Sequence, residues 1–230
     1  MAQEEFRYTS TTQQPLWQRV VMGVVAVAGA VALLWRLEIN GWPSLLWVVT
    51  LFGIAIVRAP FERRTAENTI TYTEAEKTER VLLALVGIGS SAVPFVHLVT
   101  GIFSFANYRL SNGAVLFGVG LLLVGFWMFW RSHKDLGRNW SVTTELREDH
   151  SLTTTGVYAR IRHPMYTAIA LLFASQAFFV QNAIAGVSGL AAFIVMLVLR
   201  IPYEESMMRK QFGAAYDAYV ARTGRLLPKL

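Results

Sequence analysis

Three ionisable residues stand next to the last long apolar run of the chain. Arg200 follows the run directly, and Glu204 and Glu205 come about one helical turn later, beyond Pro202. Residues four apart share a helix face, so Arg200 and Glu204 could form a simple ion pair. A guanidinium at the edge of the hydrocarbon is costly to bury, however, and is a candidate for function. Arg200 and Glu204 are therefore the first candidates for catalysis.

A second group of residues, Arg162-His163-Pro164-Met165-Tyr166, directly precedes another apolar run. Pro164 suits the first turn of a helix, where its missing N–H costs nothing. The imidazole of His163 can donate to a carboxylate or hydroxyl, and it changes charge near neutral pH. Arg162 and Tyr166 are also typical of a membrane edge, as a snorkelling side chain and an aromatic-belt residue. A purely structural role is therefore harder to assign to His163 than to Arg162 or Tyr166.

The third candidate region is a polar loop between apolar runs. It begins with Gly137-Arg138-Asn139-Trp140-Ser141 and ends with His150-Ser151-Leu152-Thr153-Thr154-Thr155-Gly156-Val157-Tyr158. Gly, Ser and Thr permit a close-fitting backbone with free N–H groups, which suits the capture of a polar small molecule. An ordinary interfacial loop, with Trp140 and Tyr158 in an aromatic belt, is the alternative.

Transmembrane helices must position these residues. Of the 230 residues, 54% are hydrophobic and 16% are charged, and the apolar blocks are too long and uniform for amphipathic surface helices. The fold class is therefore an all-α, polytopic transmembrane bundle. Six spans are expected, over residues 16–35, 43–57, 81–103, 113–130, 164–180 and 183–200. The chain has no cysteine, which excludes disulfides and thiolate chemistry.

The distribution of Lys and Arg predicts the orientation of these spans. Of the 21 basic residues, all except Arg36 and Arg109 fall on one side of a six-span topology. The positive-inside rule makes that side cytoplasmic, with both termini and the loop 131–163. The acidic amino terminus does not resemble a cleavable signal peptide, so the first span is expected to be retained. The net charge of +6 is thus explained by the orientation of the spans in the membrane and gives no reason to expect a nucleic-acid partner.

The carboxyl-terminal tail predicts an amphipathic helix. Phe212, Tyr216 and Tyr219 recur at helical spacing, which is typical of a helix lying on the membrane. The connector 58–80 mixes acidic and basic residues and suggests no chemistry.

Residues 113–228 resemble the isoprenylcysteine carboxyl methyltransferase family in its broad, prokaryotic form. The matching motifs, in order, are Gly137-Arg138-Asn139-Trp140-Ser141, His150-x-Leu152-Thr153-Thr154-x-Gly156-x-Tyr158, Arg162-His163-Pro164-x-Tyr166, Arg200-x-x-x-Glu204-Glu205, Phe212-Gly213-x-x-Tyr216-x-x-Tyr219 and Arg225-x-x-Pro228. On this basis residues 113–230 are expected to form the catalytic membrane domain. Residues 1–112 would supply the amino-terminal helices and connector.

The resemblance implies S-adenosyl-L-methionine as the methyl donor. The implied cofactor-binding residues are His150, Ser151, Leu152, Thr153, Tyr158, His163, Pro164, Met165, Tyr166 and Glu204. Arg200 would bind the carboxylate of a lipophilic, isoprenylcysteine-like acceptor that enters from the bilayer, with Arg200 and Glu204 as the catalytic pair. No metal is implied.

Other readings remain open from the sequence. Related membrane enzymes methylate a phospholipid amine or a small thiol, and an amine would need Glu204 or His163 as a base. More distant alternatives are an NADPH-dependent sterol-type reductase and a non-enzymatic membrane scaffold.

Overall fold

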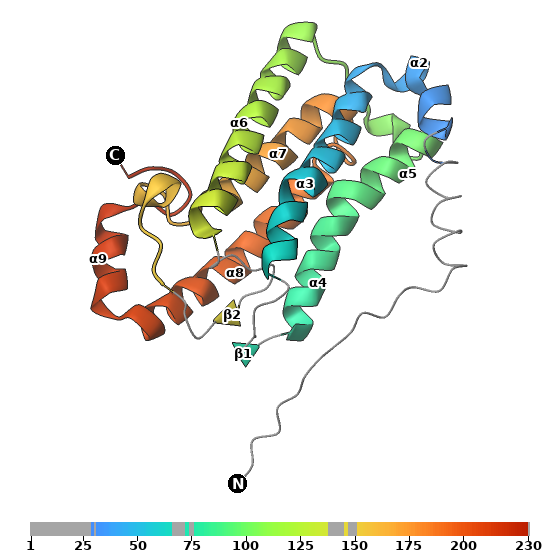
Figure 1. Ribbon diagram of the computed structural model, residues 1–230. Coiled ribbons are helices and arrows are strands. Elements are labelled where there is room, and N and C mark those ends of the chain that lie inside the picture. Colours follow the sequence, from blue (N-terminus) through green and yellow to red (C-terminus); the bar gives the residue numbers. More distant parts are fainter. Residues whose placement is uncertain are drawn as a thin grey trace.

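The computed structural model describes residues 29, 31–65, 72–73, 76–137, 145–146 and 151–229. In this part of the chain almost all regular structure is helical (Figure 1). The elements are α2 (Leu37–Asn40), α3 (Pro43–Thr65), β1 (Tyr72–Thr73), α4 (Glu76–Gly87), η1 (Ile88–Ala92), α5 (Val93–Thr100), η2 (Ser104–Ala106), α6 (Asn112–Leu136), β2 (Glu145–Leu146), η4 (Gly156–Ala159), α7 (Pro164–Val180), α8 (Ser188–Phe212) and α9 (Ala214–Arg222).

The helices form a bundle in which α6 runs along α7, α3 packs against both, and α4 packs against α8. Large apolar side chains such as Phe52, Leu116 and Val198 remain more than 60% exposed on its outer surface. This pattern is expected when lipid, and not water, surrounds the helices. In the described residues, a two-stranded antiparallel pair, Tyr72 with Leu146 and Thr73 with Glu145, joins the connector to the polar loop.

Three helical segments of the described chain are long and apolar enough to cross a membrane: Pro43–Phe61, Thr78–Thr100 and Asn112–Leu136. They correspond to the second, third and fourth expected spans. Helix α7 has the bounds expected for the fifth span but is a shorter apolar helix of 17 residues. The first expected span lies mostly outside the described residues.

The sixth expected span falls on helix α8, which begins later and runs further than the sequence indicated and is not among the three segments long and apolar enough to cross a membrane. Residues 183–187 form a turn, because the Asn182 side chain accepts hydrogen bonds from the N–H groups of Ile184 (3.0 Å) and Ala185 (2.8 Å). Helix α8 then continues through Pro202 to Phe212. The carboxyl-terminal part of α8 therefore carries Arg200, Glu204 and Glu205 on one continuous helix.

A proline explains the irregular third span. Pro94 has no N–H, so the carbonyl of Ser90 loses its helical donor. The indole Nε1 of Trp47 on α3 donates to that carbonyl at 3.1 Å, and residues 88–92 widen into the π-helical turn η1. The third span is thus interrupted by the turn η1, and the carbonyl of Ser90 within this turn is satisfied by Trp47.

Glycines bring the helices close together. A Cβ atom on Gly118 of α6 would lie 2.5 Å from Cβ of Phe178 on α7, and one on Gly89 would lie 2.6 Å from the carbonyl oxygen of Ser188 on α8. Gly118 therefore serves helix packing, as is common in membrane bundles.

The amphipathic tail helix is present as α9, but its aromatic face is covered by the protein. Tyr216 and Tyr219 are 2% and 3% exposed. The Tyr219 hydroxyl donates to the carbonyl of Tyr158 at 2.7 Å, so this face packs on η4. The expectation that these tyrosines lie on a membrane surface is therefore wrong.

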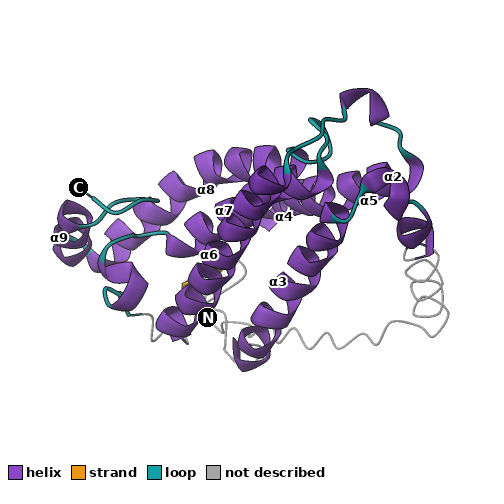
Figure 2. Ribbon diagram, turned by 90° about the horizontal axis from the view of Figure 1, so that it is seen from above, coloured by secondary structure: helices purple, strands orange, loops and turns teal. Residues whose placement is uncertain are grey.

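The two basic residues predicted on the far side lie at one end of the bundle. Arg36 precedes α2 and approaches Gly101 at the end of α5, and Arg109 follows a segment that pairs with Gln181 and Asn182. Helix α9 and the carboxyl terminus lie at the opposite end (Figures 1 and 2). The separation agrees with the predicted topology, while the membrane side of each end stays a prediction.

Candidate functional site

A polar cluster lies where the start of α7, the middle of α8 and the start of α4 meet. It consists of Glu79, Arg162, His163, Tyr166, Arg200, Glu204, Glu205 and Arg225. Hydrogen bonds or close charge contacts link all eight side chains.

The carboxyl-terminal segment of the chain, after α9, holds the entry to α7. His163 is the residue before the helix and Pro164 is its first residue, as Pro at this position favours. The N–H groups of Arg162 and His163 donate to the carbonyls of Gly224 (2.8 Å) and Arg225 (3.0 Å). The backbone of the His163 motif is therefore fixed by residues about 60 positions later.

The carboxylate of Glu204 is held from three sides. Its Oε1 accepts a hydrogen bond from the Tyr166 hydroxyl and another from Arg200 Nε at 2.7 Å. Its Oε2 lies 3.6 Å from His163 Nδ1. Glu204 is 19% exposed, so an oriented and partly buried anion stands at the centre of the cluster.

The two aromatic partners of Glu204 belong to a group of packed rings. The rings of His163 and Tyr166 stack at 5.5 Å between centroids, and Tyr166 packs edge to face with Phe193 on α8 at 6.1 Å. A carboxylate next to aromatic rings is a favourable environment for a bound cation.

Arg200 links two helices. Besides its contact with Glu204, its Nη1 lies 3.0 Å from Oε1 of Glu79 on α4. The guanidinium carbon also lies 6.0 Å from the centre of the Tyr166 ring. The ion pair of Arg200 and Glu204 therefore exists, within a larger network than a simple i,i+4 brace.

Glu205 is the deeply buried anion of the cluster, with a side chain that is 2% exposed. Burial alone would raise the pKa of this carboxyl. The contact with His163 and the hydrogen bonds from Arg225 and Arg162 outweigh burial and hold the pKa well below its ordinary value. Arg162 Nε donates at 3.1 Å, and Arg225 donates through Nε at 3.1 Å and Nη2 at 2.6 Å. This arrangement favours permanent ionisation of Glu205 and a structural role.

The structure thus brings together four of the predicted site residues: His163, Tyr166, Arg200 and Glu204. Pro164 is buried at the helix start, and Met165 packs toward the apolar core of the bundle.

The other predicted site residues are more peripheral. Tyr158 is buried with its hydroxyl 3.5 Å from the carbonyl of Ser132 on α6, and burial raises its pKa. Ser151 is exposed, Leu152 and Thr153 are half-buried, and His150 lies outside the described residues. Their proposed contacts with a cofactor stay predictions.

Glu79 is the residue that the sequence did not single out. It lies in the connector 58–80, to which no chemistry was assigned, and its partner is over 100 positions away. Arg162 and Arg225 were noticed only as motif residues, yet they neutralise Glu205. In the part of the chain that the structure describes, no group of three His, Asp or Glu side chains is arranged to hold a metal ion.

A family model and a solved structure show which class of proteins this chain resembles. Residues 114–215 match the model of a family described as phospholipid methyltransferase. The eukaryotic intramembrane Ras methyltransferase, an isoprenylcysteine carboxyl methyltransferase solved without a monobody, has the same fold. Its structure matches with a TM-score of 0.52 over 88% of this chain and 74% of its own, at 20% identity. The chain therefore has the fold of an intramembrane methyltransferase.

Curated proteins of similar sequence carry more specific names. Protein-S-isoprenylcysteine O-methyltransferase B of Arabidopsis thaliana is 27% identical over 114 residues, which is 49% of this chain and 58% of the plant protein. A probable protein-S-isoprenylcysteine O-methyltransferase of Oryza sativa subsp. indica is 31% identical over 81 residues, 35% of this chain and 42% of its own length. The chain spans about half the length of these relatives. These findings confirm the resemblance to the isoprenylcysteine carboxyl methyltransferases.

Proposed function

We propose that this protein transfers a methyl group from S-adenosyl-L-methionine to the carboxylate of a lipophilic acceptor at the cytoplasmic face of a membrane. The observation that carries the proposal is the position of Arg200. Its guanidinium stands where the apolar part of α8 ends, between Glu204 and Glu79, and beside the ring of Tyr166.

The residues around Glu204 fit a cationic donor. The donor carries a sulfonium and an ammonium group, and it supplies an electrophilic methyl group when bound. Glu204 would attract this positive charge, and the rings of His163 and Tyr166 would lie next to it. His150, Ser151, Leu152, Thr153, Tyr158, Pro164 and Met165 would complete the pocket from the adjoining loop and helix start.

Arg200 suits the acceptor carboxylate. A guanidinium binds carboxylates through two parallel hydrogen bonds and so fixes their direction. A carboxylate is already ionised, so the chain needs no general base and contributes mainly by alignment. Val198 and Leu199, 65% and 55% exposed beside Arg200, offer a lipid-facing surface to the apolar part of the acceptor.

A phospholipid amine is the second candidate acceptor, because the family model that matches residues 114–215 is described as phospholipid methyltransferase. An ammonium must lose a proton before it attacks, so a neighbouring carboxylate would then act as base. In that case Glu204 or Glu79, and not Arg200, would face the acceptor.

The test measures cofactor affinity and methyl transfer on the same samples. Purified protein in lipid nanodiscs is titrated with S-adenosylhomocysteine and assayed with N-acetyl-S-farnesylcysteine and with phosphatidylethanolamine. We expect binding of the cofactor product and methyl transfer to the carboxylate acceptor alone.

Two variants separate the roles of the central pair. Arg200→Lys should lose most turnover and keep near-normal affinity for S-adenosylhomocysteine, because an ammonium cannot reproduce the planar contact. Glu204→Gln should weaken cofactor affinity as well as rate. The matched control is Asp217→Asn, which removes a carboxylate from the exposed ion pair with Arg209. Transfer to phosphatidylethanolamine alone would replace the carboxylate proposal with the amine alternative, and binding of NADPH would point to a reductase.

A further inference from the structure

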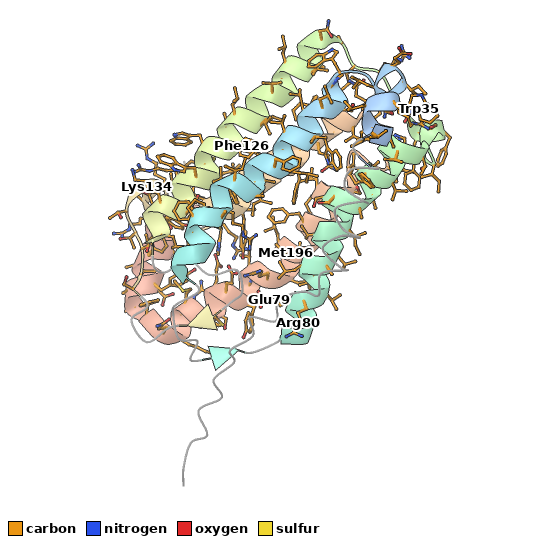
Figure 3. All side chains as sticks on the ribbon, turned by 45° about the vertical axis from the view of Figure 1, so that its right-hand side comes forward. Trp35, Glu79, Arg80, Phe126, Lys134 and Met196 are labelled. Carbon is orange, nitrogen blue, oxygen red and sulfur yellow. The ribbon has the colours of Figure 1, made fainter. Side chains whose placement is uncertain are left out.

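Glu79 comes from a different part of the chain than the other members of the polar cluster. It comes from α4, outside residues 114–215 that match the methyltransferase family. Figure 3 shows Glu79 near one end of α4 and Trp35 near the other end of the bundle. Glu79 and Arg200 are each 11% exposed, so their ion pair is largely shielded from water.

The two carboxylates on Arg200 are held differently. Glu204 shares the helix of Arg200 and also accepts from Tyr166, so its place at Nε follows from local geometry. Glu79 reaches Nη1 from another helix, across the interface between α4 and α8. Each carboxylate thus contacts a different nitrogen of Arg200. A guanidinium can bind one carboxylate through two nitrogens at once, but here two carboxylates share these positions.

An arginine at this depth needs a partner at all times. An unpaired guanidinium shielded from water is strongly unfavourable, so some anion must pair with Arg200 before the acceptor arrives. Glu204 supplies one such anion at Nε, and Glu79 supplies a second at Nη1. The carboxylate of Glu79 is chemically the same group as the acceptor carboxylate.

We propose that Glu79 is an internal competitor of the acceptor and a determinant of its specificity. It occupies the Nη1 position of Arg200 in the resting protein, and the acceptor carboxylate takes that position by displacing it. This inference rests on the proposed function, because it requires a carboxylate acceptor. No bond is made or broken in the exchange, since one ion pair replaces another.

The proposal predicts that removing the charge of Glu79 lowers the KM for the acceptor. The apparent affinity for the acceptor is reduced by the fraction of protein in which Glu79 holds Arg200. Glu79→Gln weakens the competitor while keeping its size, so KM for N-acetyl-S-farnesylcysteine should fall by about three- to tenfold. A brace that merely positions Arg200 predicts the opposite, namely an unchanged or raised KM and a lower kcat.

The experiment compares the wild type, Glu79→Gln, Glu79→Asp and the control Asp217→Asn in nanodiscs. Affinity for S-adenosylhomocysteine reports folding and should be equal in all four. The carboxamide of N-acetyl-S-farnesylcysteine serves as a competitive inhibitor that lacks the charge, and its inhibition constant should not change. Glu79→Asp has a side chain that is one methylene shorter and should lower KM by less than Glu79→Gln does. If Glu79→Gln fails to fold, the KM of Glu79→Asp is the result that tests the proposal.

The outcomes separate the inference from the proposed function. A lower KM for the carboxylate, with an unchanged inhibition constant for the amide, supports the competitor. An unchanged or raised KM in the Glu79 variants, while the wild type methylates the carboxylate, overturns the competitor and leaves the function intact. A wild type that methylates only an amine overturns both, and Glu79 variants should then lose activity.

Discussion

Replacing Glu205 with Gln should destabilise the protein more than any other single change in the polar cluster. The substitution keeps the shape of the side chain but removes the charge that neutralises Arg162 and Arg225. The two arginines are not equally exposed, and this difference determines the expected cost.

Arg162 is 9% exposed, whereas Arg225 is 53% exposed. Breaking a buried pair by removing one partner costs about 3–5 kcal/mol, because the remaining charge is left uncompensated. A solvent-screened partner contributes about 0.2–1 kcal/mol. Glu205→Gln should therefore cost several kcal/mol through Arg162, and Arg225→Ala should cost about 1 kcal/mol or less.

The measurement is reversible unfolding in mixed detergent micelles, followed by helical circular dichroism, on the wild type and both variants. Asp217→Asn is the control, and its exposed ion pair predicts a change within about 0.5 kcal/mol. The reasoning would be refuted by a Glu205→Gln variant that loses no more stability than Arg225→Ala. In that case Arg162 would be paired by water or by its backbone partners, the carbonyls of Thr223 and Val220.

Three further predictions use the same protein. Because the pKa of Glu205 is held below its ordinary value of 4.5, its stabilisation is complete above about that pH and is lost as the pH falls further; unfolding measured against pH should show this acid limb in the wild type and not in Glu205→Gln. Tyr166→Phe removes the donor to Glu204 and should weaken S-adenosylhomocysteine binding by about 1–2 kcal/mol in calorimetry, whereas Tyr108→Phe, whose hydroxyl donates to the carbonyl of Ala177 at the other end of the bundle, should not; equal affinities would remove Tyr166 from the pocket. Since the chain has no cysteine, single cysteines can report topology: Ala183→Cys should react with an impermeant reagent from outside the cell and Leu227→Cys only after permeabilisation, and the reverse pattern would invert the orientation.

Helix type and the candidate site residues of the polar cluster could be picked out from the sequence because both depend on local properties. Long apolar runs must form helices in lipid, and Pro164 and the Arg200–Glu204 spacing have meaning within a single helical turn. The start of α8 at Ser188 was missed because it depends on one side-chain contact, the hydrogen bonds that Asn182 makes to the next turn. A hydropathy pattern contains no information on such a bond.

The partners of the charged residues were decided by the fold. Glu79 meets Arg200, and Arg225 meets Glu205, only because α4 and the carboxyl-terminal segment after α9 pack on α8 and α7. The same packing buries the aromatic face of α9 against η4, where the residue spacing alone was equally compatible with a lipid surface. Periodicity identifies which face of a helix is apolar, whereas the identity of the surface that covers it depends on contacts between residues far apart in the chain.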